Sequence, residues 1–218
     1  DFGTNGAGIP AVSGGWKELA RTTLGSTGDI INVTSIPDKR YYMVLMDEQG
    51  ATLNALLNVG NGSPDMTENY SLRRKVTGNS EHTDATSWEL FNDGIGSNSG
   101  MFNVGYISNL ASKEKLFIAS TVSQETAGAG TAPKRVQHVG KWRNTSNVIN
   151  YMRLQNWGTG SFSSGAEMVV LGWDEDDTHT DNFWEPLADV SLSGTSNQID
   201  SGTFTAKKYL WVQAFMSA

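Results

Sequence analysis

The chain has 218 residues, no cysteine and a formal net charge of −7 at pH 7. This length suffices for one large β-domain or two small ones. The acidic balance argues against nucleic-acid binding, which needs clustered Lys and Arg. The lack of cysteine excludes disulfides, thiolate metal sites and Cys nucleophiles. The long stretches of low charge are polar, so we expect no membrane insertion.

Five of the first fifteen residues are glycine, which predicts a flexible arm over residues 1–15. From residue 16 onwards, short runs rich in β-branched and aromatic residues alternate with Gly, Asn and Ser turn clusters. These runs predict strands at residues 16–24, 29–34, 40–47, 52–59, 69–77, 87–92, 101–108, 115–123, 135–142, 147–156 and 167–173. No window shows a helical stripe of ten residues. We expect an all-β fold, an antiparallel β-sandwich with jelly-roll-like topology, over residues 16–183.

The end of the chain repeats the beginning of this domain. Trp16 and Trp184 are 168 residues apart, and so are Tyr41 and Tyr209. The constant offset predicts that residues 184–218 are a partial repeat of residues 16–50. Further strands are then expected at residues 187–192, 198–200 and 207–215.

The last of these predicted strands, like its counterpart at residues 39–46, is nearly all apolar after a basic start. Both patterns are typical of interior strands with two covered faces. An unpaired apolar strand at a sheet edge would aggregate, so residues 184–218 should pack on their own sandwich or on a neighbouring one. The candidate assembly or packing anchors are the aromatic residues Trp16, Trp184, Tyr41, Tyr209 and Trp211.

Several strings carry a family resemblance. Residues 57–62 end in a Gly/Asn turn, and an Asn-Tyr-x-x-Arg-Arg strand follows at residues 69–74. With residues 104–116, 169–174 and 204–212, this pattern resembles uncharacterised structural proteins of tailed bacteriophages, especially marine ones with internal repeats. The resemblance implies a β-sandwich displayed in oligomers, often trimers, as in head decoration proteins, fibres and adhesins. It brings no catalytic residue with it.

The residues that could carry chemistry form no recognisable active-site pattern. The acidic run at residues 174–181 could supply oxygen ligands to calcium, but it lacks the spacing of a calcium loop, and a solvated linker is the preferred interpretation. His82, His138 and His179 have no metal-ligand spacing. Gly-x-Ser-x-Gly and phosphate-binding motifs are also absent. We therefore expect no enzymatic activity, no cofactor and no metal.

Three aromatic residues flank a predicted strand pair and could stack on sugar rings: Trp142, Tyr151 and Trp157. Most Trp residues in a β-sandwich are core or interface residues instead, and we favour that interpretation.

The sequence thus predicts a non-enzymatic virion structural protein, a head decoration or fibre component that acts through oligomeric assembly. Its partners would be copies of itself, for example in a trimer, and other virion proteins. It would be made in the host cytoplasm and displayed on the particle surface. Two alternatives stay open: a carbohydrate-binding adhesin module that recognises a host surface glycan, and a self-polymerising extracellular filament subunit.

Overall fold

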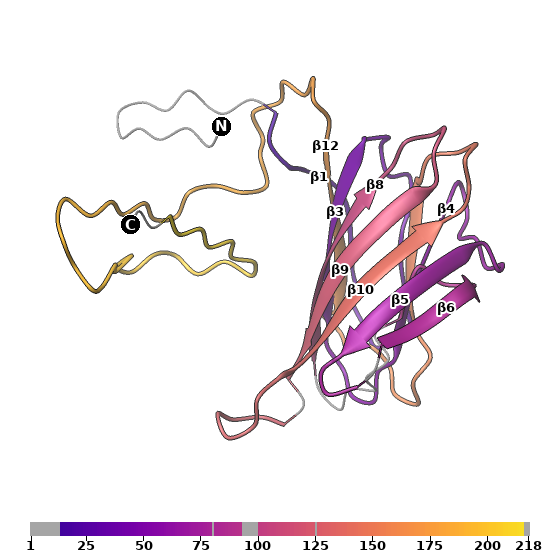
Figure 1. Ribbon diagram of the computed structural model, residues 1–218, viewed down its shortest axis with the longest axis horizontal. Helices are drawn as coiled ribbons and strands as arrows, with labels where there is room; N and C mark the ends of the chain where they lie inside the picture. Colours follow the sequence, from indigo (N-terminus) through magenta and orange to yellow (C-terminus); the bar gives the residue numbers. More distant parts are fainter. Residues whose placement is uncertain (1–13, 80, 93–99, 125, 216–218) are drawn as a thin grey trace.

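The computed structural model describes residues 14–79, 81–92, 100–124 and 126–215. Within them the chain forms twelve β-strands, arranged in two antiparallel sheets that pack face to face, and no helix (Figure 1). The predicted all-β sandwich is confirmed. The predicted N-terminal arm falls outside the described residues except for its last two positions.

The strands divide unequally between the sheets. The large sheet has the order β1 (Lys17–Thr23), β12 (Glu167–Trp173), β3 (Tyr41–Glu48), β8 (Met101–Ser108), β9 (Lys115–Ser123), β10 (Lys134–Trp142), β5 (Tyr70–Val76) and β6 (Glu81–Ser87). The small sheet has the order β2 (Ile30–Val33), β11 (Tyr151–Asn156), β4 (Ala55–Gly60) and β7 (Phe91–Asn92). An arrangement of eight strands against four does not confirm the expected jelly-roll topology.

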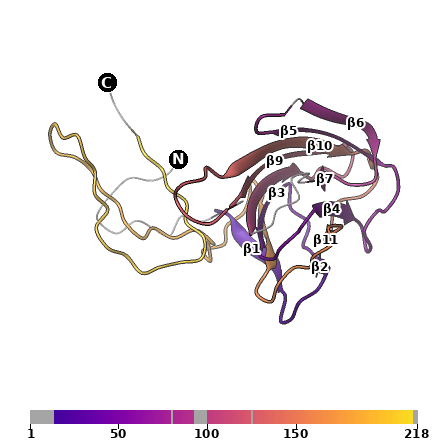
Figure 2. The same ribbon diagram turned by 90° about the horizontal axis from the view of Figure 1, so that it is seen from below.

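The core lies between the two sheets, as the end-on view shows (Figure 2). Strand β9 alternates strictly between buried and exposed residues, so one face points to the core and the other points outward. Strand β4 is buried along its whole length. Strand β3 is buried on both faces over residues 42–46, as predicted for this apolar run.

Strand β6 has no counterpart among the predicted strands. Its sequence, Glu-His-Thr-Asp-Ala-Thr-Ser, contains no large apolar residue, and most of its side chains are exposed. It pairs with β5 alone and forms one edge of the large sheet. An edge strand with both faces wet needs no apolar alternation, which is why the pattern missed it.

The strands predicted at residues 187–192, 198–200 and 207–215 are wrong. Residues 184–215, here called the C-terminal segment, form no strand and project from the sandwich (Figure 1, yellow). In the first copy, β1 pairs with β12, β2 with β11, and β3 with β12 and β8. Within the described residues, these partners of β1, β2 and β3 have no counterpart beside residues 184–215.

Candidate assembly interface

The outer face of the large sheet carries a second, smaller apolar cluster. Met43 and Leu45 of β3 and Val169 and Leu171 of β12 point away from the main core and are nonetheless almost fully buried. They are covered by partly buried side chains from both chain ends and from β8: Trp16, Phe102, Val104, Phe183, Trp184 and Tyr209. The C-terminal segment therefore packs across the face of the sheet and does not extend it at an edge.

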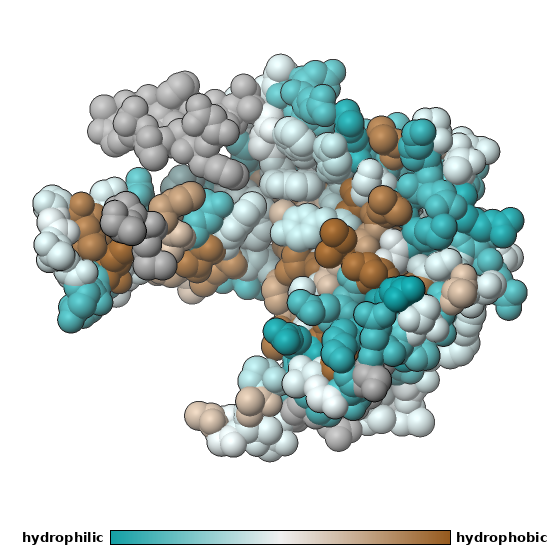
Figure 3. All heavy atoms as spheres, in the orientation of Figure 1, coloured by the Kyte–Doolittle hydropathy of each residue, from teal (hydrophilic) through white to brown (hydrophobic). Residues whose placement is uncertain are grey.

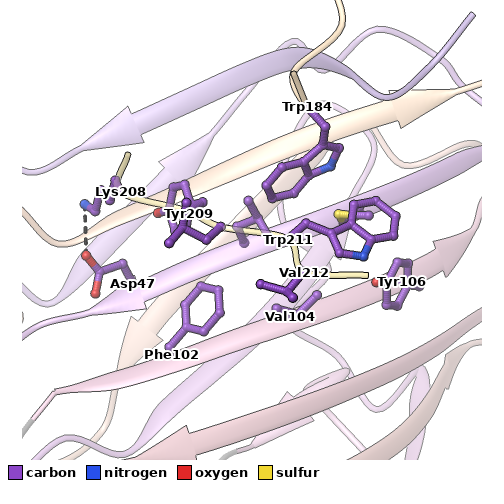
Figure 4. A pocket seen from close by; sticks show the side chains of 12 residues that line it. Asp47, Phe102, Val104, Tyr106, Trp184, Lys208, Tyr209, Trp211 and Val212 are labelled. Carbon is purple, nitrogen blue, oxygen red and sulfur yellow. Dashed lines mark ion pairs between the residues drawn. The ribbon is translucent and has the colours of Figure 1, made fainter. Parts of the chain in front are cut away.

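The segment and the sheet enclose an apolar groove of about 430 Å³ (Figure 4). Strands β3 and β8 form the floor of the groove, and the C-terminal segment forms the side that faces them. The lining residues are Met43, Leu45, Asp47, Phe102, Val104, Tyr106, Trp184, Lys208, Tyr209, Leu210, Trp211 and Val212. We call this the apolar groove.

Polar contacts fix the segment at one end of the groove. The hydroxyl of Tyr209 donates a 2.7 Å hydrogen bond to Glu167, which is buried in β12. Lys208 forms ion pairs with Glu167 at 3.1 Å and with Asp47 at 2.9 Å (Figure 4). Two side chains of β1 also donate hydrogen bonds to the Glu167 carboxylate: the Thr23 hydroxyl at 2.7 Å and the Arg21 guanidinium at 3.1 Å. One carboxylate thus joins β1, β12 and the C-terminal segment.

This environment keeps Glu167 ionised. Burial by itself would raise the pKa of its carboxyl, but the hydrogen bonds from Tyr209, Thr23 and Lys208 and the charge of Arg21 outweigh burial and lower the pKa to about 2. The pKa of the Tyr209 hydroxyl is raised, mainly by burial and then by its hydrogen bond to the Glu167 carboxylate. Both groups therefore keep the protonation states that the hydrogen bond needs at neutral pH.

Four of the five predicted anchors meet at this face. The ring of Trp16 lies 6.4 Å from Tyr106, and Tyr209 stacks on Phe102 at 5.8 Å. Trp184 meets Trp211 edge to face at 5.5 Å. The fifth anchor, Tyr41, lies at the start of β3, outside this cluster, and stacks on Trp173 of the neighbouring strand at 5.5 Å.

The sequence analysis missed Glu167 and Asp47 as partners of the C-terminal segment. Each is an acidic residue within an otherwise apolar strand, and both face outward beside each other in the β12–β3 register. An acidic residue in a strand with two covered faces needs a partner, because burying an unpaired charge is costly. That signal could have indicated a basic partner, but not Lys208.

The acidic run, predicted to be a solvated linker, is exposed at Glu175, Asp176 and Asp181 but is tied to the sandwich at Asp174 and Asp177. Asp174 and Asp177 both pair with Lys39, and Asp174 also accepts a 2.5 Å hydrogen bond from the backbone amide of Arg40. Arg40 also pairs with Glu175. The run therefore fixes the exit of β12 against the start of β3. Among the described residues, no group of three acidic or histidine side chains has the geometry to hold a metal ion.

The three candidate sugar-stacking residues do not form one site. Trp142 is buried and donates a 2.9 Å hydrogen bond to Asp65, so it is a core residue. Tyr151 begins β11 and Trp157 follows its end, about 20 Å away along an extended strand. Trp157 is 51% exposed and lies against Trp88, with ring centroids 4.0 Å apart. Trp157 alone of the three presents a ring to solvent.

His138 is a core residue. Its Nε2 lies 3.2 Å from the hydroxyl of Thr121, and its ring packs 4.3 Å from Phe91. Burial, assisted by the charge of Arg74, lowers the pKa of His138 to about 3, so the imidazole is neutral at physiological pH. His82 is instead exposed on β6, where it pairs with Asp84.

Beyond the apolar groove, the outer faces of β9 and β10 carry exposed side chains. Four apolar side chains of β9 and β10 are exposed there and form what we call the open strip: Leu116, Ile118, Val122 and Val139. Ile118 is 62% exposed and pairs with Tyr106 on one side and Val139 on the other. The strip therefore continues the apolar surface that begins under the C-terminal segment.

No family model matches the chain, and a search of curated proteins finds no significant match. The described residues include no helix with the length and apolar character needed to cross a bilayer.

Proposed function

We propose that the protein is a structural subunit that acts through association with copies of itself, as a component of a tailed-phage particle such as a head decoration or a fibre. The observation that carries this proposal is the apolar surface that a single copy leaves uncovered. In the C-terminal segment, Val212 is 85% exposed and Phe215 is 84% exposed. The open strip lies on the same sheet as the groove. Contiguous exposed apolar surface of this kind marks contact sites between proteins.

The phage assignment rests on the family resemblance of the sequence, and the assembly role rests on the exposed apolar surface. The most direct test is quantitative mass spectrometry of purified phage particles whose genome encodes the chain. We expect a fixed, integral number of copies per particle. Finding the chain only in the lysate and never in particles would contradict the proposed location.

A second candidate function is glycan binding, and it is favoured by the exposed ring of Trp157 and its contact with Trp88. Aromatic faces of this kind can stack on sugar rings. A glycan-array signal that is lost in Trp157→Ala but kept in Tyr151→Ala would support this role. An array without signal, together with stable oligomers, would leave structural assembly as the better assignment.

A further inference from the structure

We infer that the open strip of one copy is the docking site for residues 185–206 of a second copy. Residues 185–206, here called the excursion, are the part of the C-terminal segment between its two contacts with the sheet. The inference rests on the proposed assembly function and assigns the surfaces that meet in it.

Both ends of the excursion lie over the outer face of the large sheet. Trp184 precedes the excursion and contacts the ring of Trp211, and Lys208, which follows the excursion, pairs with Asp47 of β3. Between these points the chain projects away from the sandwich in both views (Figures 1 and 2). Its own copy therefore holds both ends of the excursion over β3 and β8 and leaves its middle uncovered.

The uncovered residues of the excursion are of the type that the fold buries. Its exposed apolar side chains are Val190, Leu192, Ile199 and Phe204. At the repeat offset, Ile199 corresponds to Ile31 and Phe204 to Ile36, and both of these counterparts are almost fully buried in the main core. The excursion thus keeps core-type residues without a core around them.

The charges of the two surfaces are complementary. The excursion carries Glu185, Asp189 and Asp200 and no basic residue; Glu185 pairs with the adjoining Lys207 at 3.5 Å, and the other two form no ion pair among the described residues. On the outward-facing positions of β10 and β5, the open strip is bordered by four basic residues: Arg73, Lys75, Arg135 and Lys141. Within the described part of the chain, Glu81 pairs with Arg73 and Glu114 pairs with Lys141, which leaves the charges of Lys75 and Arg135 for a partner.

A second copy satisfies both surfaces at once. Each copy offers one apolar, acidic excursion and one apolar strip with a basic border, so one kind of contact covers both when it repeats through an oligomer. Complementary charge would also steer the encounter and make it sensitive to salt. In the space-filling view, apolar surface is visible on both parts (Figure 3).

The test measures the self-association constant of the full chain by analytical ultracentrifugation. Ile118→Lys on the strip and the double variant Leu192→Ser/Phe204→Ser on the excursion should each raise the dissociation constant at least about tenfold. Ile30→Lys, which makes the same substitution at an exposed position of β2 in the small sheet, and Ser191→Ala, beside Leu192, are the matched controls. Both controls should associate like the wild type.

A mixing experiment identifies the partner of each surface. The strip variant keeps an intact excursion, and the excursion variant keeps an intact strip. Native mass spectrometry of the mixture should therefore show complexes that contain one copy of each variant, whereas each variant alone should stay monomeric. If the wild type associates but Ile118→Lys weakens the association no more than Ile30→Lys does, or if mixing restores nothing, the assigned contact is wrong while the assembly function stands. If the wild type is a monomer at every concentration, both fall.

Discussion

The hydroxyl of Tyr209 donates a hydrogen bond to Glu167, a buried carboxylate that lies 42 residues earlier in the chain. This contact joins a segment without regular secondary structure to the interior of an eight-stranded sheet. It explains how residues 207–212 can be held in place although they form no strand.

Removing this hydroxyl should loosen the C-terminal segment without unfolding the sandwich. Tyr209→Phe keeps the ring that stacks on Phe102 but loses a hydrogen bond to a charged group, which contributes about 1.5–3 kcal/mol. We expect the undocked fraction of residues 207–212 to rise roughly tenfold or more, as measured by the backbone 15N relaxation of these residues. The melting temperature of the sandwich should stay the same, because no ladder bond is lost.

Tyr41→Phe is the control, since Tyr41 lies at the equivalent position of the first copy and makes a stacking contact with Trp173. It should leave the 15N relaxation of residues 207–212 unchanged. Equal relaxation in Tyr209→Phe and the wild type would show that the hydroxyl does not hold the segment.

The contact at Glu167 should weaken in acid. Its pKa is about 2 in the folded protein against an ordinary value of 4.5, so the stabilisation is complete above about pH 4.5 and is lost as the pH falls towards 2. The difference corresponds to about 3 kcal/mol. The 15N relaxation of residues 207–212 as a function of pH measures the loss. Glu167→Gln should show a loosened segment at every pH, and a pH dependence equal to that of the wild type would contradict the assignment.

A second acid-sensitive group lies in the main core. The pKa of His138 is lowered to about 3, whereas the unfolded chain has the ordinary value of 6.5, so the stability due to neutral His138 is complete above pH 6.5 and falls as the pH drops towards 3. The full difference is about 5 kcal/mol. Urea unfolding at several pH values should show a flatter profile for His138→Gln than for the wild type. An NMR titration with an ordinary pKa for His138 would contradict this expectation.

Trp142 should behave as a core residue. Trp142→Phe loses the hydrogen bond to Asp65 and leaves a cavity, and we expect the free energy of unfolding to fall by about 2–4 kcal/mol. Trp157→Phe, at an exposed position, should change it by less than about 0.5 kcal/mol. Urea unfolding followed by circular dichroism compares the two, and equal effects would argue against the core assignment.

The sequence predicted those strands that carry an apolar face, whether burial alternates along them, as in β8 and β9, or runs through them, as in β12. The bounds expected for β8, β9 and β12 agree with the structure, because each strand has an apolar face against the core and turn residues at both ends. It missed β6, whose polar residues give no periodic signal. The local sequence pattern could therefore predict the fold class but not the edge strand β6.

The same reasoning failed at the C-terminal segment for a different physical reason. Residues 207–215 have the composition of β3, but strand formation also requires neighbours to pair with, and composition does not supply them. Trp184 and Tyr209 stand at the repeat offset from Trp16 and Tyr41, which the sequence alone shows. Their receptor, the outer face of β3 with Glu167, depends on three-dimensional register, which no pattern in the sequence reveals.

The two margins of the large sheet differ sharply from its apolar outer face. β1 carries Lys17, Glu18 and Arg21, and β6 carries Glu81, His82 and Asp84. Charged and polar side chains on both edge strands oppose pairing with a strand of another chain. Even at high protein concentration, the sheets of different copies should therefore not join edge to edge into cross-β fibrils.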